Sequence, residues 1–308
     1  MATLKGQNLR ILAIGLDGSS WACIGMATNC TITLTNNTDD ANTKDDVGLS
    51  TKPEVVSKAW SVQVDSLNVL NAAAMLTAIK NMQKVDIMWD EVGTDNQTPV
   101  PSSGAAAYAR KGKAYISDLT LSFNDRENSA KNLQFTGASQ LEVVPSTGIT
   151  YEVLDPGSYT KGQFVRLFLG SDNTATPAKV IASAKQLQLH VSLQMEDATT
   201  KDTEGNWQIQ EPTGLSYDIT SNALVRGGDA ISSQVQAQGL IEVESIFEAG
   251  TPVKFQIANV SGANNRTKGA VIVSGSVIVS QLTINAQNRQ NATYDTTLNG
   301  YGAYTVGA

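Results

Sequence analysis

The sequence is poor in the side chains on which most enzymes and metal sites depend. Its 308 residues include one histidine, His190, and two cysteines, Cys23 and Cys30. These three side chains cannot complete the usual four-ligand zinc site, so we expect both cysteines to be reduced, buried thiols. The nucleophile elbow, the P-loop, the dinucleotide-binding glycine motif and His-Glu-x-x-His are all missing. We therefore predict that the protein is not an enzyme and has no catalytic residue, metal or cofactor.

Charged residues are also scarce, and the negative net charge is unfavourable for binding nucleic acid. Charged residues make up 17% of the chain, and the net charge is −7. Phosphate binding needs clustered Lys and Arg, and the only clear basic run, at 109–113, is interpreted as a solvated loop edge. No apolar run could span a bilayer, and the N-terminal segment is typical of a first strand and not of a signal peptide. We expect a protein that folds in a cytoplasm and does not contact a membrane.

What the sequence does contain is alternation of apolar and polar residues. In LQLHVSLQM (187–195) the apolar side chains fall on one face, and His190 falls on the polar face without any marked partner. Helical spacing is confined to residues 68–82 and 231–248. Further alternating runs lie at 30–37, 61–64, 85–89, 119–123, 215–219, 253–257 and 271–279. The predicted fold class is mainly β, with antiparallel β-sandwich or barrel domains that each carry one flanking α-helix.

Several motifs occur twice in the same order, 156 to 163 residues apart. The pairs are Lys5-Gly6-Gln7 with Arg10 and Lys161-Gly162-Gln163 with Arg166; Thr43-Lys44-Asp45 and Thr200-Lys201-Asp202; Lys111-Gly112 and Lys268-Gly269; and RENSAKNLQFTG (126–137) and RQNATYDTTLNG (289–300). Ordered recurrence of this kind indicates a duplicated domain. We predict copy one at residues 1–144, a linker rich in Pro and Gly at 145–160, and copy two at 161–308.

Two acidic clusters accompany the repeated turns, and a calcium loop is the functional alternative to a solvated one. Asp39, Asp40, Asp45 and Asp46 lie at the first turn, and Glu196, Asp197, Asp202 and Glu204 lie at the second. Neither cluster has the ligand order, the central Gly and the closing Glu of an EF-hand. The four tryptophans, Trp21, Trp60, Trp89 and Trp207, could form a sugar-binding face, but alternation places Trp89 in a core. We interpret both turns as solvated loops.

The repeated pattern resembles the phage major tail tube protein family. The resemblance rests on a strand, a Thr-Lys-Asp-x-x-Gly turn, a strand, a helix and a strand, followed by a closing segment with Arg-x-Asn. The turn glycines are Gly48 and Gly205; Trp207 follows the second turn, whereas Leu49 stands at the corresponding place in the first. The resemblance implies a domain that joins its neighbours side by side into rings, usually of six, which stack into a hollow tube.

The function that this resemblance implies is that of a structural tail tube subunit through which DNA passes without specific binding. It implies a virion tail location, assembly in the host cytoplasm, and tape-measure, tail terminator and baseplate proteins as partners. With two copies per chain, three chains would close one ring. Two alternatives stay open: the tube of a contractile injection or secretion apparatus, and a two-domain β-sandwich binding module.

The repeated turns are the candidate contact between stacked rings. Polar, Gly-containing segments bury too little surface to offset their own ordering entropy, so we expect a neighbouring ring to order them. The candidate contact residues are Thr43, Lys44, Asp45, Asp46, Thr200, Lys201, Asp202 and Glu204.

Overall fold

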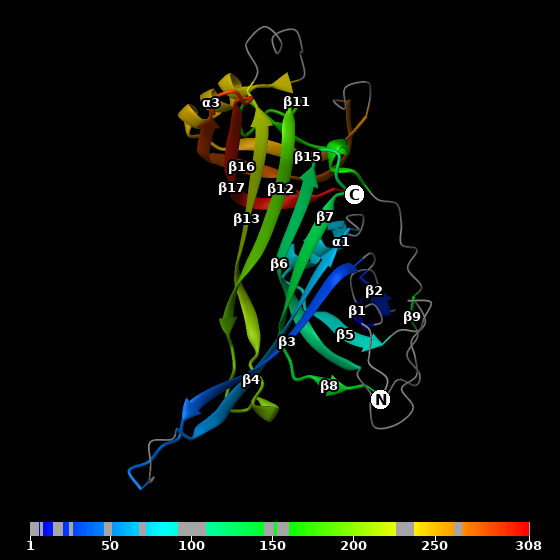
Figure 1. The fold of residues 1–308 in the computed structure, drawn as a ribbon, viewed down its shortest axis with the longest axis vertical. Helices are drawn as coiled ribbons and strands as arrows, with labels where there is room; N and C mark the ends of the chain where they lie inside the picture. Colours follow the sequence, from blue (N-terminus) through cyan, green and yellow to red (C-terminus); the bar gives the residue numbers. More distant parts are fainter. Residues whose placement is uncertain are drawn as a thin grey trace.

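The protein is an elongated, mostly β molecule (Figure 1). This structure is a computed structural model, and it describes residues 6, 9–14, 21–24, 27–45, 51–67, 72–91, 109–144, 151–152, 160–225, 237–261 and 267–307. Most of the expected linker, 145–160, lies outside the described residues. So do the loop after the strand at 85–91 and the segment 226–236.

The first half contains β1 to β9 and one helix. These elements are β1 Leu9–Ile14, β2 Trp21–Cys23, β3 Ala27–Asp40, β4 Pro53–Ser66, α1 Ala72–Lys80, β5 Val85–Glu91, β6 Arg110–Asn124, β7 Ala130–Gly137, β8 Glu142–Val143 and β9 Tyr151–Glu152. The alternating runs predicted within this half all lie in strands, and α1 lies within the predicted helix.

The second half repeats this order of elements. It consists of η2 Gly162–Phe164, β10 Val165–Leu169, β11 Lys179–Ile181, β12 Ala184–Asp197, η3 Glu204–Asn206, β13 Gln210–Leu224, β14 Ala237–Gln238, α3 Leu240–Ala249, β15 Val253–Ser261, β16 Thr267–Asn285 and β17 Thr293–Val306. The predicted strands are again confirmed. The helix α3 overlaps the end of the predicted segment 231–248.

Six antiparallel strand pairings of the first half recur in the second. The pairs β1–β2, β1–β5, β3–β4, β4–β7, β5–β6 and β6–β7 correspond to β10–β11, β10–β15, β12–β13, β13–β17, β15–β16 and β16–β17. The registers also correspond: Thr33 lies opposite Ser61 as His190 lies opposite Asp218. Each residue of β3 and β4 thus has a counterpart 157 positions later.

One of the four predicted repeat anchors is wrong in its register. Gly112 lies opposite Ile87 on β5, and the residue in that place in the second half is Gly275, opposite Phe255 on β15. The expected counterpart, Gly269, lies further toward the start of β16. The reason is that β16 pairs with β15 over a longer stretch than β6 pairs with β5, so matching letters near the strand start do not match positions.

Glycines in both halves make room for a large aromatic ring. A Cβ on Gly112 or Gly137 would lie 2.6 or 2.5 Å from the ring of Trp60, which is buried. In the second half a Cβ on Gly300 would lie 2.5 Å from the ring of Tyr217, the counterpart of Trp60. The Trp60 indole donates to the carbonyl oxygen of Ser139, and the Tyr217 hydroxyl donates to that of Ser276. Each ring is therefore packed under a strand and is also hydrogen-bonded.

The halves are joined edge to edge by β6 and β12. These strands pair antiparallel from Gln186 opposite Asn124 to Ser192 opposite Asp118, so that the strands form one hydrogen-bonded sheet. The apolar faces of both strands are buried, and one hydrophobic core runs from the first half into the second. The helix α1 packs on β6 and reaches β12 and β17. The Tyr304 hydroxyl on β17 donates to the Leu76 carbonyl oxygen of α1 at 2.6 Å.

Candidate assembly site

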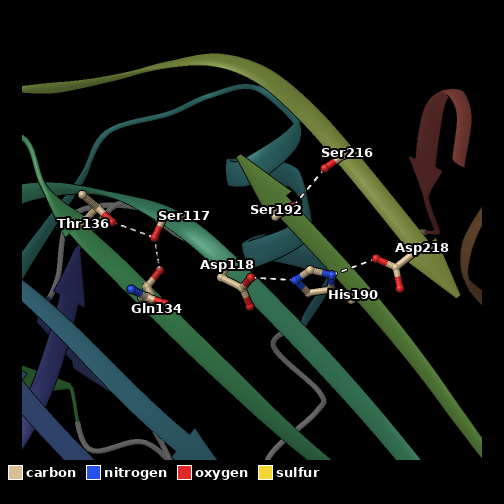
Figure 2. A network of polar contacts seen from close by, with 8 residues as sticks. All are labelled: Ser117, Asp118, Gln134, Thr136, His190, Ser192, Ser216 and Asp218. Atoms are coloured by element: carbon tan, nitrogen blue, oxygen red, sulfur yellow. Dashed lines mark hydrogen bonds and ion pairs between the residues drawn. The ribbon is translucent and has the colours of Figure 1, made fainter. Parts of the chain in front are cut away.

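The single imidazole of the chain lies at the junction between the two halves. Its Nε2 is 2.6 Å from Oδ2 of Asp118 on β6, and its Nδ1 is 2.8 Å from Oδ1 of Asp218 on β13 (Figure 2). Alternation places His190 on the polar face of β12, as predicted. The sequence marks no partner for it, but strand pairing brings a carboxylate to each side of the ring.

The two carboxylates favour the charged imidazole. Partial burial alone would lower the pKa of His190, but its hydrogen bonds to both aspartates and their negative charges outweigh burial and raise the pKa above its usual value. When protonated, both ring nitrogens donate and both contacts are charge-assisted. The junction is therefore tightest when His190 carries its proton.

This geometry suits a structural role for His190. A general base needs one ring nitrogen free to accept a proton from a nucleophile, while the other is held by an orienting group. Here carboxylates occupy both nitrogens. The Ser192 and Ser216 hydroxyls on β12 and β13 are hydrogen-bonded to each other at 2.9 Å. The cluster fastens β6, β12 and β13 together.

Further polar contacts continue across the first half beside this junction. The Ser117 hydroxyl donates to the Gln134 carbonyl oxygen at 3.3 Å and accepts from the Thr136 hydroxyl at 2.8 Å (Figure 2). Ser117 is the extra residue of a bulge in β6, since Ile116 and Asp118 lie opposite adjacent residues of β7. The bulge presents the Ser117 hydroxyl to β7 and lies next to Asp118 in the chain.

The first Thr-Lys-Asp turn lies at the tip of a long hairpin. The strands β3 and β4 extend away from the rest of the sheet and end near this turn (Figure 1). Thr43, Lys44 and Asp45 are exposed there, and Asp46 lies outside the described residues. Their exposure agrees with the interpretation of this turn as a solvated loop.

The second Thr-Lys-Asp turn is placed differently, because it folds back onto β4. The backbone N–H of Gln208 donates to the carbonyl oxygen of Lys58 at 2.7 Å, and the Lys58 ammonium lies 5.9 Å from the centre of the Trp207 ring. Thr200, Lys201 and Asp202 remain exposed, and Glu204 opens the short helix η3. Within the chain, the second turn therefore meets the first half, whereas the first turn projects outward.

The other candidate residues of the sequence show no ligand geometry in the described part of the chain. No group of three or more His, Cys, Asp or Glu side chains is arranged to hold a metal ion among the residues described. Cys30 is a free thiol whose pKa burial raises to about 11. Trp60 and Trp89 are buried against each other with ring centres 6.1 Å apart, which confirms Trp89 as a core residue. No described helix is long and apolar enough to cross a membrane.

Asp118 and Asp218 are the site residues that sequence reasoning missed. Each lies in an alternating run on the same polar face as His190: Asp118 directly before LTLSF and Asp218 within LSYDI. The signal was therefore present as polarity, but nothing in it specified that these three strands become neighbours.

The fold is that of a mostly β protein whose two similar halves join strand to strand. Residues 162–306 match the family described as phage tail tube protein. The second half of the chain is thus similar to that family, which confirms the resemblance seen in the motifs.

No curated protein matches the chain. Among solved structures it is similar to a chain in "Virion of native gene transfer agent (GTA) particle", with 16% identity, 48% of this chain and 99% of that chain covered, and a TM-score of 0.37. It is similar at 15% identity to one in "Tail of empty GTA particle computed with helical refinement, C6 symmetry", with 47% and 95% covered and a TM-score of 0.35. It is also similar to a chain in "Hybrid structure of the SPP1 tail tube by solid-state NMR and cryo EM - NMR Ensemble". The identity is 15%, the match covers 48% of this chain and 78% of that chain, and the TM-score is 0.35.

Proposed function

We propose that the chain is a structural subunit of a phage tail tube, whose copies form stacked rings around a hollow conduit for DNA. The observation that carries this proposal is the family match over residues 162–306. The six strand pairings of that segment recur in residues 9–137, which supports a second tail-tube unit in the first half.

Each chain would then contribute two neighbouring units to one ring. The units are residues 1–144 and 161–308, connected by 145–160. Support comes from the β6–β12 pairing, which joins the two halves edge to edge in one sheet. If a ring needs six units, three chains close it with pseudo-sixfold symmetry.

The charge of the chain suits a passage for DNA. A wall that carries a net charge of −7 per chain would not retain phosphates, because each retained contact adds salt-dependent affinity. The role is structural and not enzymatic, in keeping with carboxylates on both nitrogens of the only imidazole. The protein would act in the virion tail after assembly in the host cytoplasm, beside tape-measure, tail terminator and baseplate proteins.

Electron microscopy of the purified protein tests the proposal. We expect hollow tubes, whose reconstruction shows three chains per ring and alternating copies of the two halves. Discrete monomers under all assembly conditions would contradict a tube subunit and favour a binding module. Six chains per ring, with the two halves on separate levels, would contradict the ring arrangement alone.

A further inference from the structure

The β6–β12 junction is a contact between a first half and a second half that happens to lie within one chain. In a ring of alternating halves, every second junction must lie between chains. At a junction between chains, a strand of the second half that corresponds to β6 pairs with a strand of the first half that corresponds to β12. These two strands are β16 and β3.

Both of these strands have a free edge at the required place. Among the strands that the structure describes, β3 pairs only with β4. The strand β16 pairs with β17 along 273–285, but its pairing with β15 ends at Val277. The other edge of residues 278–285 therefore has no partner strand in the described chain, whereas the corresponding edge of β6 holds β12.

The register of the missing pairing follows from the internal repeat. Each residue of β12 corresponds to the residue of β3 that lies 157 positions earlier. Each residue of β6 beyond its bulge corresponds to the residue of β16 that lies 163 positions later. This offset follows because Ala114 lies opposite Gly137 and Val277 lies opposite Gly300. Leu121 opposite Leu189 becomes Ile284 opposite Ile32. Thr120 opposite His190 becomes Thr283 opposite Thr33, and Leu119 opposite Val191 becomes Leu282 opposite Leu34.

Side chains that are buried at the first junction are exposed at these two edges. Leu121 and Val191 are at most 1% exposed, whereas their counterparts Ile284 and Leu34 are 52% and 62% exposed. Edge strands that must stay unpaired are normally protected by charged residues, bulges or Pro. Residues 29–35 and 278–285 contain no charged residue and no Pro. The bulge between Val279 and Gln281 also occurs in β6, which nevertheless pairs with β12 beyond it.

The helix of the second half shows the same difference. At the first junction α1 packs across β6 and β12, and its Ile79 is 1% exposed. Counted back from the following strand, the counterpart of Ile79 on α3 is Phe247, which is 42% exposed. The helix α3 packs on β16 but has no counterpart of β12 beside it. A neighbouring β3 would cover Phe247 together with Ile284.

We propose that chains join by antiparallel pairing of β16 residues 281–285 with β3 residues 31–35 of a second copy, with Thr283 opposite Thr33. The proposal rests on the proposed tube function and specifies the partner and register of that assembly. The contact joins unlike edges, so each chain can bind a further copy on both sides, and three chains complete the ring of the proposed tube. The polar partners differ from those of the first junction: Thr33, Ser61 and Gln281 replace His190, Asp218 and Asp118, so that this junction is uncharged.

Disulfide trapping tests the register. In a chain carrying Cys23→Ser and Cys30→Ser, the pair Thr33→Cys and Thr283→Cys would place two thiols directly opposite, with Cβ atoms about 4.5–5.5 Å apart. We expect oxidation to give covalent trimers on a non-reducing gel. The matched control, Thr35→Cys with Asn285→Cys, uses the same strands and polar face four positions out of register, about 13 Å apart, and should stay uncross-linked.

The single-cysteine variants distinguish other modes of contact. Dimers from Thr33→Cys alone or Thr283→Cys alone would show like-with-like edges and would overturn the proposal. Tubes that form normally without trapping at the in-register pair would also overturn it while leaving the tube function intact. Failure of the wild-type chain to form tubes or rings would instead count against the function.

A charge on the edge gives a second, independent measurement. Leu34→Lys and Ile284→Lys should each leave the chain folded, by circular dichroism, but monomeric on size-exclusion chromatography. Val143→Lys is the control, because Val143 is an equally exposed apolar residue, 63% exposed, on β8. It should assemble as wild type. Normal assembly of both edge variants would overturn the proposal.

Discussion

The imidazole of His190 and the carboxylate of Asp118 lie 2.6 Å apart across the boundary between the two halves of the chain. This contact is the charged part of a junction that is otherwise built from backbone pairing and apolar side chains. Asp218 lies on β13 and contacts the other ring nitrogen of His190, which completes the cluster. The stability of the junction therefore depends on the proton that His190 carries.

Stability should fall as the pH rises through the raised pKa of His190. A group whose pKa is higher in the folded than in the unfolded state stabilises the fold fully below its unfolded value, near 6.5, and stops doing so as pH rises through the folded value. We expect thermal unfolding midpoints to be higher at pH 6 than at pH 9. The comparison with His190→Gln, which lacks this proton, should show a difference that shrinks toward pH 9.

Removing the imidazole should lower the free energy of unfolding by more than the removal of a polar side chain without partners would. Because the cluster is about one-third exposed, we expect His190→Ala to lose about 1 kcal/mol at pH 6 and to remain folded. A double-mutant cycle of His190→Gln with Asp118→Asn measures the coupling by chemical unfolding. Additive effects of the two changes would show that the contact contributes nothing to stability.

The glycines that cover Trp60 and Tyr217 should not tolerate a methyl group. A Cβ on Gly137 or Gly300 would lie 2.5 Å from ring atoms that are themselves held by hydrogen bonds. We expect Gly137→Ala and Gly300→Ala each to destabilise the fold by about 1–3 kcal/mol in denaturant unfolding. Gly6→Ala is the control, because nothing lies within 4 Å of its added Cβ. Equal stability of all three variants would mean that the rings can shift freely.

The repeated turns should matter for assembly more than for folding. Lys44, Asp45, Lys201 and Asp202 are exposed, and an exposed ion pair contributes about 0.2–1 kcal/mol. Each single Ala variant should therefore assemble nearly normally, whereas the quadruple variant should remain a soluble chain that forms short tubes or none. Tube length in electron micrographs is the measurement, and full-length tubes from the quadruple variant would rule out a ring-to-ring role.

Docking of the second turn on β4 should depend on Trp207. Loss of the ring removes the cation–π contact with Lys58, which contributes about 0.5–1 kcal/mol at an exposed site. We expect trypsin to cleave after Lys201 faster in Trp207→Ala than in wild type, with Trp207→Phe in between. Cleavage after Lys44, in the projecting first turn, should be unchanged and serves as the internal reference.

Alternation in the sequence was sufficient to place β3 to β6, β12, β13, β15 and β16. In LQLHVSLQM every apolar residue through Leu193 is buried on one face, because side chains alternate across any pleated strand whatever its neighbours are. The positions of α1 and α3 followed in the same way from helical spacing. The prediction that Gly112 corresponds to Gly269 was wrong. A short sequence match does not specify which residues of two strands lie opposite each other.

The sequence by itself determined the strands, the helices, the repeated turns and the polar face on which His190 lies. These properties depend on local periodicity and backbone preference. Only the tertiary structure decided that β6 of one half pairs with β12 of the other, that Asp118 meets His190, and that Leu34 and Ile284 remain exposed at free edges. Strand pairing is a contact between residues distant in the chain, and its register depends on which edges become neighbours when the whole sheet forms.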